Sequence, residues 1–294
     1  CYMDSILQSI FGPNNNILKK EILYVNLNSD TRENLCEIKN RVQIQQKLID
    51  INNTIQNISI EKDEVKNVKN LRKELKNCPR EEDEQFFGTK MRDSGDFLAY
   101  LLSMFPISET ATSKITNFAT NSEKEHPSKN ELVLSSVIKD KKASIIVHIN
   151  CSDLVVENKY PIKDFLYILE DSKKLDKDNY YIPSEGEGKG KEYNRKITRI
   201  DIIDSPVIIF SATRASPSGD YSKTKLIPSD QIELISGKTL YLSAITVYDQ
   251  NHYYCYFKCN NKWFLYDDTK RERIEQRDID IDTVSEQGTQ YFYT

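Results

Sequence analysis

The sequence pattern changes near residue 131, and this change limits the possible folds more than any other feature. Residues 31–77 repeat apolar side chains at spacings of three and four with charges between them, which predicts amphipathic helices. From 131 onward, segments rich in β-branched and aromatic residues are bounded by turn residues and predict strands. These segments are 131–138, 143–151, 196–203, 205–213, 239–249, 252–259 and 263–269. Helices followed by strands are typical of an α+β protein.

Three shorter segments also predict helices. Residues 1–11 place their apolar side chains on one helical face and end at the breaker GPNNN. Residues 97–105 form a dense apolar face after an Asp/Ser-rich start that can cap a helix. Residues 161–174, PIKDFLYILEDSKK, predict a helix placed among the strands.

The composition excludes several classes of protein. The chain has 294 residues, of which 38% are hydrophobic and 29% are charged, so it is long enough to bury a substantial core. Its 41 basic and 45 acidic residues are mixed along the chain and form no basic stripe, so no nucleic-acid partner is expected. The longest apolar runs, such as PVIIF, have the length of a strand, so no membrane association is expected. The composition leaves the oligomeric state open.

The six cysteines show no paired spacing of the kind that zinc ribbons need, so no structural zinc site is expected. A long charged chain with a core of its own needs no disulfides. We therefore expect a reducing, intracellular compartment, cytoplasmic or nuclear.

His252 is the most informative of the three histidines. His126 lies in a polar loop and His148 inside a strand pattern, where structural roles are the simpler interpretation. His252 begins the first strand of a predicted hairpin with an Asn-Asn turn, and Asp267 follows the second strand. An imidazole beside a carboxylate has its tautomer fixed and its charged form stabilised, as a general base requires. The same pattern also fits an aromatic hairpin with a polar end.

Cys1 is a candidate nucleophile because it stands at the start of a predicted helix. Unpaired N–H groups and the positive end of the helix dipole favour the thiolate there. The alternative is a buried structural cysteine. The combination with the His252/Asp267 hairpin favours catalysis, and the other five cysteines are expected to be inert.

Five segments, taken in order, resemble the ubiquitin-specific protease family of deubiquitinases. CYMDSILQSI is similar to the family's Cys box, and RDSGDFLAYLL to its Gln-Gln-Asp-Ala-x-Glu-Phe-Leu helix. SPVIIFSATR resembles the strand that ends in Arg, and LYLSAITVYDQNHYYCYFKCNNKWFLYDD resembles the His box. The closing SEQGTQYFYT is similar to the family's last strand. The resemblance extends through the whole chain.

The resemblance implies a papain-like cysteine protease fold in one catalytic domain. Residues 1–130 would form the helical thumb, and residues 131–294 the β-rich palm with reduced fingers. The fingers lack the family's zinc-binding cysteine pairs.

The resemblance also assigns roles to single residues. Cys1 would be the nucleophile, His252 the base and Asp267 the acid that orients it, with Asp268 as a second, assisting aspartate. No metal or cofactor is needed for this chemistry. By the same resemblance, Asp93 would hold the arginine-containing tail of ubiquitin, and Tyr253 would line the narrow channel for its Gly-Gly end.

Three positions depart from the family pattern. Asn251 replaces the glycine before the histidine, and Met91 replaces a glutamine that helps to hold the ubiquitin tail. The family's oxyanion-stabilising asparagine precedes the catalytic cysteine, whereas this chain opens on Cys1. We interpret that opening as a cut in a longer protein at the catalytic cysteine.

The predicted function is a cysteine isopeptidase that removes ubiquitin from lysine side chains. One alternative is a protease for another ubiquitin-like modifier such as SUMO, and a second is a pseudo-protease that binds ubiquitin without cutting it. A third is an N-terminal nucleophile hydrolase that uses the amine of Cys1. The helices that follow Cys1 disfavour the third, because that fold is rich in strands from its start.

Overall fold

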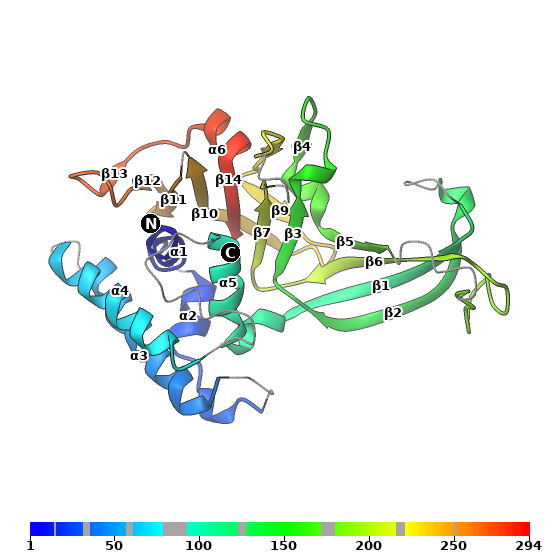
Figure 1. Cartoon of the computed structure of the whole chain (residues 1–294), viewed down its shortest axis with the longest axis horizontal. Helices are drawn as coiled ribbons and strands as arrows, with labels where there is room; N and C mark the ends of the chain where they lie inside the picture. Colours follow the sequence, from blue (N-terminus) through cyan, green and yellow to red (C-terminus); the bar gives the residue numbers. More distant parts are fainter. Residues whose placement is uncertain are drawn as a thin grey trace.

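The first part of the chain is helical. The computed structural model describes residues 1–14, 16–31, 36–56, 61–78, 93–122, 128–171, 180–215, 221–249 and 251–294. Its α-helices in this part are α1 (Tyr2–Phe11), α2 (Ile17–Leu23), α3 (Ile38–Gln56), α4 (Glu61–Leu75) and α5 (Ser94–Ser103). Short 3-10 helices lie at Leu27–Ser29, Pro106–Glu109, Lys129–Glu131, Cys151–Asp153 and Ile162–Phe165. The helices gather on one side of the molecule (Figure 1).

Most of the remaining chain forms strands, so the predicted α+β class is confirmed. The largest sheet has the order β13-β12-β11-β10-β14-β7-β3, and β9 pairs with β10 beside this path. Its strands are β3 (Ile146–Asn150), β7 (Ile208–Thr213), β9 (Gln231–Glu233), β10 (Thr239–Asp249), β11 (His252–Cys259), β12 (Lys262–Tyr266), β13 (Ile274–Gln276) and β14 (Gly288–Tyr293). The sheet is antiparallel apart from the β3–β7 pair. Helix α6 (Ile281–Gln287) leads directly into β14.

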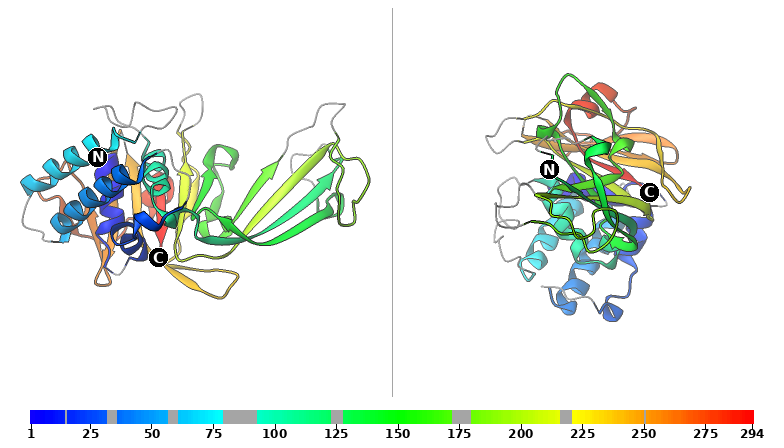
Figure 2. Two further views of the ribbon diagram at one scale, coloured as in Figure 1. Left: turned by 90° about the horizontal axis from the view of Figure 1, so that it is seen from below. Right: turned by 90° about the vertical axis from the view of Figure 1, so that its right-hand side faces the viewer.

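A second sheet projects from the body as an arm. It has the order β2-β1-β6-β5, with β1 (Ala111–Thr120), β2 (Val133–Ala143), β5 (Tyr167–Asp171) and β6 (Arg195–Asp204). Figure 2 shows the arm extending away from the helices. Strands β4 (Lys159–Pro161) and β8 (Lys225–Ile227) form a separate parallel pair.

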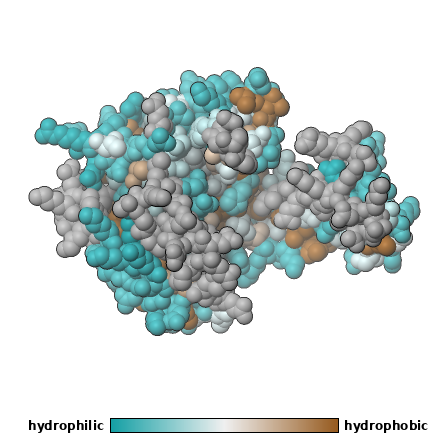
Figure 3. All heavy atoms as spheres, in the orientation of Figure 1, coloured by the Kyte–Doolittle hydropathy of each residue, from teal (hydrophilic) through white to brown (hydrophobic). Residues whose placement is uncertain are grey.

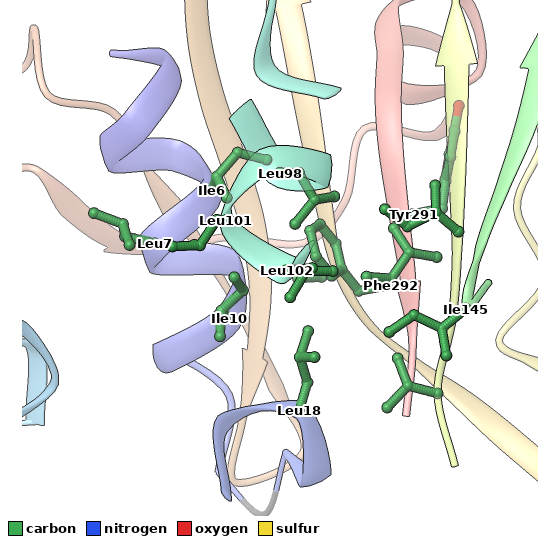
Figure 4. Packing of buried hydrophobic residues seen from close by; sticks show 14 of the residues in the cluster. Ile6, Leu7, Ile10, Leu18, Leu98, Leu101, Leu102, Ile145, Tyr291 and Phe292 are labelled. Atoms are coloured by element: carbon green, nitrogen blue, oxygen red, sulfur yellow. The ribbon is translucent and has the colours of Figure 1, made fainter. Parts of the chain in front are cut away.

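Helix α1 lies in the core between α3 and the strands β10 and β11. Nine of its ten residues are buried, which is the pattern of a helix enclosed on all sides. Ile6 and Ile10 from α1 lie near Leu98 and Leu102 from α5, and these pack toward Phe292 of β14 (Figure 4). Each fully buried aliphatic or aromatic side chain contributes about 1.5–3 kcal/mol to folding. The surface over α3 and α4 is mostly hydrophilic (Figure 3).

The secondary structure differs from the sequence-based prediction in two segments. Strand β1 was not predicted, because its segment ATSKITNFAT mixes polar and apolar residues, but pairing with β2 and β6 on both sides holds it. The helix predicted for 161–174 is wrong: the segment forms a short 3-10 turn and then β5, which pairs with β6. Residues 172–174 lie outside the described residues. In 161–174, cross-strand pairing outweighed the helical periodicity of the sequence.

The expectation that the chain holds no disulfide is also wrong. Cys36, just before α3, is bonded to Cys78, just after α4, across a sequence separation of 42. Both side chains are buried in the core. Their distance in sequence hid the pair, which forms because α3 and α4 pack side by side.

None of the helices in the described part of the chain is both long and apolar enough to cross a membrane.

Candidate active site

Helix α1 places Cys1 at its N-cap, as the sequence predicts. The buried face of α1 anchors this helix against the large sheet, which fixes where its first residue lies. The Cys1 side chain is half-buried, and its backbone nitrogen lies 3.2 Å from Asp4 Oδ2. A cysteine at a helix start is exposed to the positive end of the dipole, which favours its thiolate.

The β11–β12 hairpin brings His252 and Asp267 together. Cys259 pairs with Lys262 across an Asn260–Asn261 turn, in which both asparagines have positive φ, 51° and 59°. This is the turn geometry that Asn residues favour in two-residue hairpins. The paired strands end at Cys255 and Tyr266. Continuing the same register sets Asp267 opposite Tyr254, and His252, two residues before Tyr254, points to the same face of the hairpin. His252 Nε2 lies 2.9 Å from Asp267 Oδ1.

Three hydrogen-bond donors stabilise the carboxylate form of Asp267. Its Oδ1 accepts hydrogen bonds from His252 Nε2 at 2.9 Å, from the Thr269 backbone N–H at 3.0 Å and from Thr269 Oγ1 at 2.6 Å. Burial acts to raise the pKa of Asp267, but the bonds from Thr269 and His252 outweigh it and lower that pKa. Asp267 therefore stays charged beside the imidazole. Because Asp267 holds Nε2, the ring leaves Nδ1 for proton exchange.

Asp268 lies between Cys1 and His252. Its Oδ2 is 3.2 Å from the Cys1 nitrogen, and its Oδ1 is 3.7 Å from His252 Nε2. Oδ1 is buried and has no hydrogen-bond partner among the described residues. The structure thus brings Cys1, His252, Asp267 and Asp268 to one place, although 251 positions separate the first two in sequence.

Three of these residues, His252, Asp267 and Asp268, are the one group in the described ranges that could share a metal ion. Ligand atoms of His252, Asp267 and Asp268 lie within 4.8 Å of one another. Nε2 of His252 is already hydrogen-bonded to Asp267. Nε2, the ring nitrogen on the side of the two aspartates, is therefore not available to an ion that these three residues would share. The three side chains fit a hydrogen-bonded catalytic pair better than a metal centre.

A cleft of about 800 Å³ opens beside His252, and we call it the active-site cleft. Asp93, Asp96 and Asp249 line it, so carboxylates dominate its charged groups, although Glu286 is paired with Lys225 at 2.9 Å. Its lining also includes Ala212, Arg214, Ala215, Tyr221, Lys223, Tyr248, Asn251, Tyr253, Gln287 and Thr289. The charge of the cleft suits a basic ligand.

Asp93 has a structural task in addition to lining the cleft. It is the N-cap of α5, and its Oδ1 accepts hydrogen bonds from Gly95 N at 2.7 Å and Asp96 N at 3.1 Å. The next residue, Ser94, hydrogen-bonds to the Tyr253 hydroxyl and donates to Gln290 Oε1 at 2.7 Å. Helix α5 is therefore fastened to the sheet at the point where Asp93 reaches the cleft.

Tyr253 forms part of the cleft wall and is largely buried. Burial, with the charge of nearby Asp93, raises the pKa of its hydroxyl, so Tyr253 stays neutral. Its ring centroid lies 4.8 Å from that of Tyr248, which lies 5.6 Å from Tyr221. Three aromatic rings in succession therefore form one side of the cleft.

Asn251, which replaces the family's glycine, has φ of 70°. This left-handed conformation favours glycine, and asparagine is among the side chains that tolerate it best. The Asn251 Oδ1 also accepts a hydrogen bond from Tyr248 OH at 2.9 Å. The replacement is therefore compatible with the local backbone. Met91 and His126 lie outside the described residues.

Several residues of the site are not among those predicted from the sequence. Thr269 could have been found, because a threonine two residues after an aspartate commonly hydrogen-bonds to it. No sequence signal marks Tyr221 or Gln287. The Tyr221 hydroxyl and Gln287 Oε1 are buried at the cleft and have no partner in the part of the chain that the structure describes.

Arg214, the end of the SPVIIFSATR segment, is a structural residue. It is buried and donates to four backbone carbonyls, those of Gly288 at 2.8 Å, Ser285 at 2.8 Å, Thr224 at 2.7 Å and Ser222 at 3.3 Å. These bonds tie the end of β7 to the start of β14 beneath the cleft. The guanidinium is thus fully engaged by protein groups.

Solved structures that resemble this chain do so at low sequence identity. No curated protein matches the sequence. The solved structure of the Saccharomyces cerevisiae PAN2 pseudoubiquitin-hydrolase is similar, with 12% identity, a TM-score of 0.45, and coverage of 99% of this chain and 81% of that one. The MERS coronavirus papain-like protease is similar at 9% identity, with a TM-score of 0.36 and coverage of 99% and 76%.

A cysteine-bearing helix packed against an antiparallel sheet that carries the histidine and aspartate is a papain-like arrangement, as the resemblance implied. The sequence matches the family described as ubiquitin carboxyl-terminal hydrolase over residues 1–293. The chain belongs to the ubiquitin carboxyl-terminal hydrolase family.

Proposed function

We propose that the protein is a cysteine isopeptidase that hydrolyses the bond between the C-terminal glycine of ubiquitin and a lysine side chain. The observation that carries the proposal is the His252–Asp267 hydrogen bond beside an acidic cleft. Asp268 lies 3.7 Å from the same ring nitrogen and 3.2 Å from the Cys1 nitrogen, so Cys1 stands next to this pair. Family membership supports a ubiquitin substrate.

In the proposed reaction, His252 Nδ1 accepts the proton of the Cys1 thiol, and the thiolate attacks the carbonyl carbon of the terminal glycine. The C–N bond breaks as His252 returns the proton to the lysine amine, which leaves a thioester on Cys1. His252 then takes a proton from water, and the resulting hydroxide attacks the thioester. The C–S bond breaks and the thiol is restored, so the protein ends in its starting state.

Asp267 would act on His252 and not on the substrate. Its carboxylate fixes the ring with Nε2–H toward Oδ1, and it stabilises the imidazolium that forms when Nδ1 is protonated. Asp268, 3.7 Å from the same nitrogen, would add to this stabilisation. Both roles need charged carboxylates, which suits the lowered pKa of Asp267.

The active-site cleft suits an extended basic peptide such as the tail of ubiquitin. Carboxylates of Asp93, Asp96 and Asp249 offer partners for arginine side chains. The buried hydroxyl of Tyr221 and the buried Oε1 of Gln287 have no partner among the described residues, so each can bond to a peptide backbone. A buried polar atom without a partner costs about 1–3 kcal/mol, so a ligand that satisfies both atoms would gain affinity.

Two alternatives remain distinct from this proposal. The same chemistry could act on another ubiquitin-like modifier such as SUMO, since a cleft of carboxylates does not identify the modifier. A pseudo-protease would bind ubiquitin without cleaving it, but the assembled Cys1, His252 and Asp267 set favours catalysis.

The test uses ubiquitin with a C-terminal electrophile, incubated with the wild-type protein, with Cys1→Ala and with Cys151→Ala as a matched control. Cys151 is a buried cysteine that does not line the cleft, and burial raises its pKa. We expect a covalent adduct by mass spectrometry with the wild type and Cys151→Ala but not with Cys1→Ala. An adduct only with a SUMO probe would change the substrate. No adduct with either probe, together with binding of unmodified ubiquitin, would establish the pseudo-protease.

A further inference from the structure

A second pocket lies where α1 and the β11–β12 hairpin end, and we call it the hairpin-end pocket. Its volume is about 260 Å³. Its walls come from Phe257, Phe264, Ile55 and Ile274, with the two phenylalanine rings stacked at 5.6 Å. The apolar lining and the volume suit a ligand of about the size of one aromatic ring with a short substituent.

One polar group in this pocket needs a partner. Gln8 is 2% exposed, and its Nε2 has no hydrogen-bond partner among the described residues. Gln8 lines the pocket together with Gly12. An amide N–H can only donate, so the atom that satisfies it must be an acceptor such as a carbonyl oxygen.

Gly12 leaves the space in which this amide lies. A Cβ at this position would come within 2.6 Å of the Gln8 backbone oxygen, 2.7 Å of Phe257 Cδ2 and 2.9 Å of Gln8 Nε2. Gly12 has φ of −67°, so its backbone conformation does not demand glycine. The requirement is room beside the end of α1 and the side chains around the pocket.

Cys259 gives the pocket a second functional group. Its thiol is half-buried and lines the pocket, and it lies near enough to the Lys19 ammonium for an electrostatic interaction. The pocket is therefore a built site: apolar walls, one unsatisfied donor at the base and a thiol at the side.

The two elements that form the pocket also carry the catalytic residues. Helix α1 begins beside Cys1 and ends at Gly12, about 15 Å away at 1.5 Å per residue. Strand β11 begins with His252 and ends with Cys259, about 23 Å away. Helix α1 packs directly on β11. A ligand bound between Gly12 and Cys259 would shift α1 relative to β11, and with it Cys1 relative to His252.

We propose that the hairpin-end pocket binds a small ligand with an apolar body and one carbonyl oxygen, and that its occupancy alters catalysis by moving α1 against β11. The oxygen accepts a hydrogen bond from Gln8 Nε2, and the body packs between Ile55 and the two phenylalanines. The second part of this statement rests on the proposed hydrolase function, whereas the binding itself does not.

The first experiment measures binding by protein-observed NMR with two probes of the same shape. Acetophenone has an aromatic ring and a carbonyl, and α-methylstyrene replaces the oxygen by a methylene. We expect wild type to bind acetophenone about five- to tenfold more tightly, as one hydrogen bond provides. Gln8→Met should remove this preference, and Cys259→Phe, which fills the pocket, should abolish binding of both probes.

The second experiment measures turnover of a ubiquitin conjugate at saturating acetophenone. We expect the ligand to change kcat in the wild type but not in Cys259→Phe, whose basal activity should match the wild type. Absence of acetophenone binding to the wild type, or a preference for acetophenone over α-methylstyrene that persists in Gln8→Met, would overturn the assigned site. Binding without a change in kcat would overturn the coupling. A protein that binds the probe but shows no turnover of any conjugate would contradict the proposed function and leave the binding result standing.

Discussion

His252 Nε2 and Asp267 Oδ1 lie 2.9 Å apart because one hairpin carries both, at a separation of 15 residues. No other helix or strand is needed to bring these two groups together. Cys1, by contrast, reaches them only through the packing of α1 on β10 and β11. The base and its orienting acid are thus a local feature of the chain, and the nucleophile depends on the tertiary fold.

Asp267→Asn should lower kcat by about 10²–10⁴ while leaving the fold intact, because an amide in this position no longer fixes the imidazole as a base. Asp268→Asn should have a smaller effect, since Asp268 lies 3.7 Å from the ring nitrogen and not at hydrogen-bond distance. Steady-state kinetics with a fluorogenic ubiquitin substrate would measure both. Equal losses in the two variants would contradict the assignment of Asp267 as the orienting acid.

Thr269→Val should move the acid limb of kcat/KM to higher pH. Thr269 Oγ1 donates to Asp267 Oδ1 at 2.6 Å and helps to lower the pKa of this carboxyl, so its loss raises that pKa. Asp267 then becomes protonated sooner as the pH falls, and His252 loses its orienting charge. Thr283→Val is the matched control, because Thr283 makes the equivalent bond to Asp280 at 2.8 Å outside the site. A similar shift of the limb in both variants would argue against a local cause.

The same two carboxyls make the stability of the protein depend on pH. The pKa values of Asp267 and Asp280 are lowered from an ordinary 3.8, so each contributes stability above pH 3.8 that is lost as the pH falls through its folded value. Both threonine variants should therefore be less stable than wild type at neutral pH and approach it in acid. Urea unfolding between pH 3 and pH 7 would measure this convergence.

Asp93→Asn should raise KM for a ubiquitin substrate by about tenfold with little change in stability. The asparagine side chain can still cap α5, as Asp93 does through Gly95 and Asp96, so the variant removes charge and keeps the cap. Asp93→Ala should raise KM and also cost about 1 kcal/mol of stability through the lost cap. Asp153→Asn, at an exposed position that does not line the cleft, is the control for charge alone. An unchanged KM in Asp93→Asn would remove Asp93 from the binding site.

Arg41→Met should destabilise the protein by about 3–5 kcal/mol. Arg41 is 1% exposed, donates to Met104 O at 2.8 Å and pairs with the buried Asp30, so its removal takes the cation from a buried carboxylate. Lys47→Met on the same helix breaks a partly exposed pair with Asp50 at 3.6 Å and should cost about 0–1 kcal/mol. Urea unfolding would compare them, and equal costs would show that the Arg41 pair is not buried in solution.

The Cys36–Cys78 disulfide should be detectable by counting free thiols, because two of the six cysteines would not react with a thiol reagent before reduction. Under denaturing conditions without reductant, we expect four free thiols, those of Cys1, Cys151, Cys255 and Cys259, and six after reduction. Closing a loop of 42 residues contributes about 4 kcal/mol in the chain-entropy picture, so reduction should lower the free energy of unfolding. Six thiols without reductant would agree instead with the reducing compartment expected from the sequence.

The parts of the structure that the sequence predicts are those in which local pattern and tertiary environment agree. The bounds of β10 and β11 match the predicted segments, because alternating β-branched and aromatic residues there also face a core. Helix α1 and the turn at Asn260–Asn261 were likewise predicted from local signals. These elements hold His252 and Asp267, which is why this pair could be predicted from one sequence.

The rest depended on contacts between distant segments. Strand β1 is held by β2 and β6 on its two sides, and β5 forms on the edge of β6 where helical periodicity favoured a helix. Tyr221 and Gln287, the last residue of α6, both line the cleft, and nothing in their neighbouring residues marks them. Asp268 between Cys1 and His252 could be suggested only by family resemblance, because its contact needs α1 in place.

The two-residue turn at Asn260–Asn261 limits how this chain can diverge. Successive side chains of a strand point to opposite faces, so one residue inserted into β12 with the two-residue turn retained would shift the pairing by one and reverse the direction of every following side chain. Asp267 would then point away from His252, while the hairpin could still form. We therefore expect homologous active enzymes to tolerate many substitutions along β11 and β12 but to keep the number of residues between the histidine and the aspartate constant or to change it by an even number.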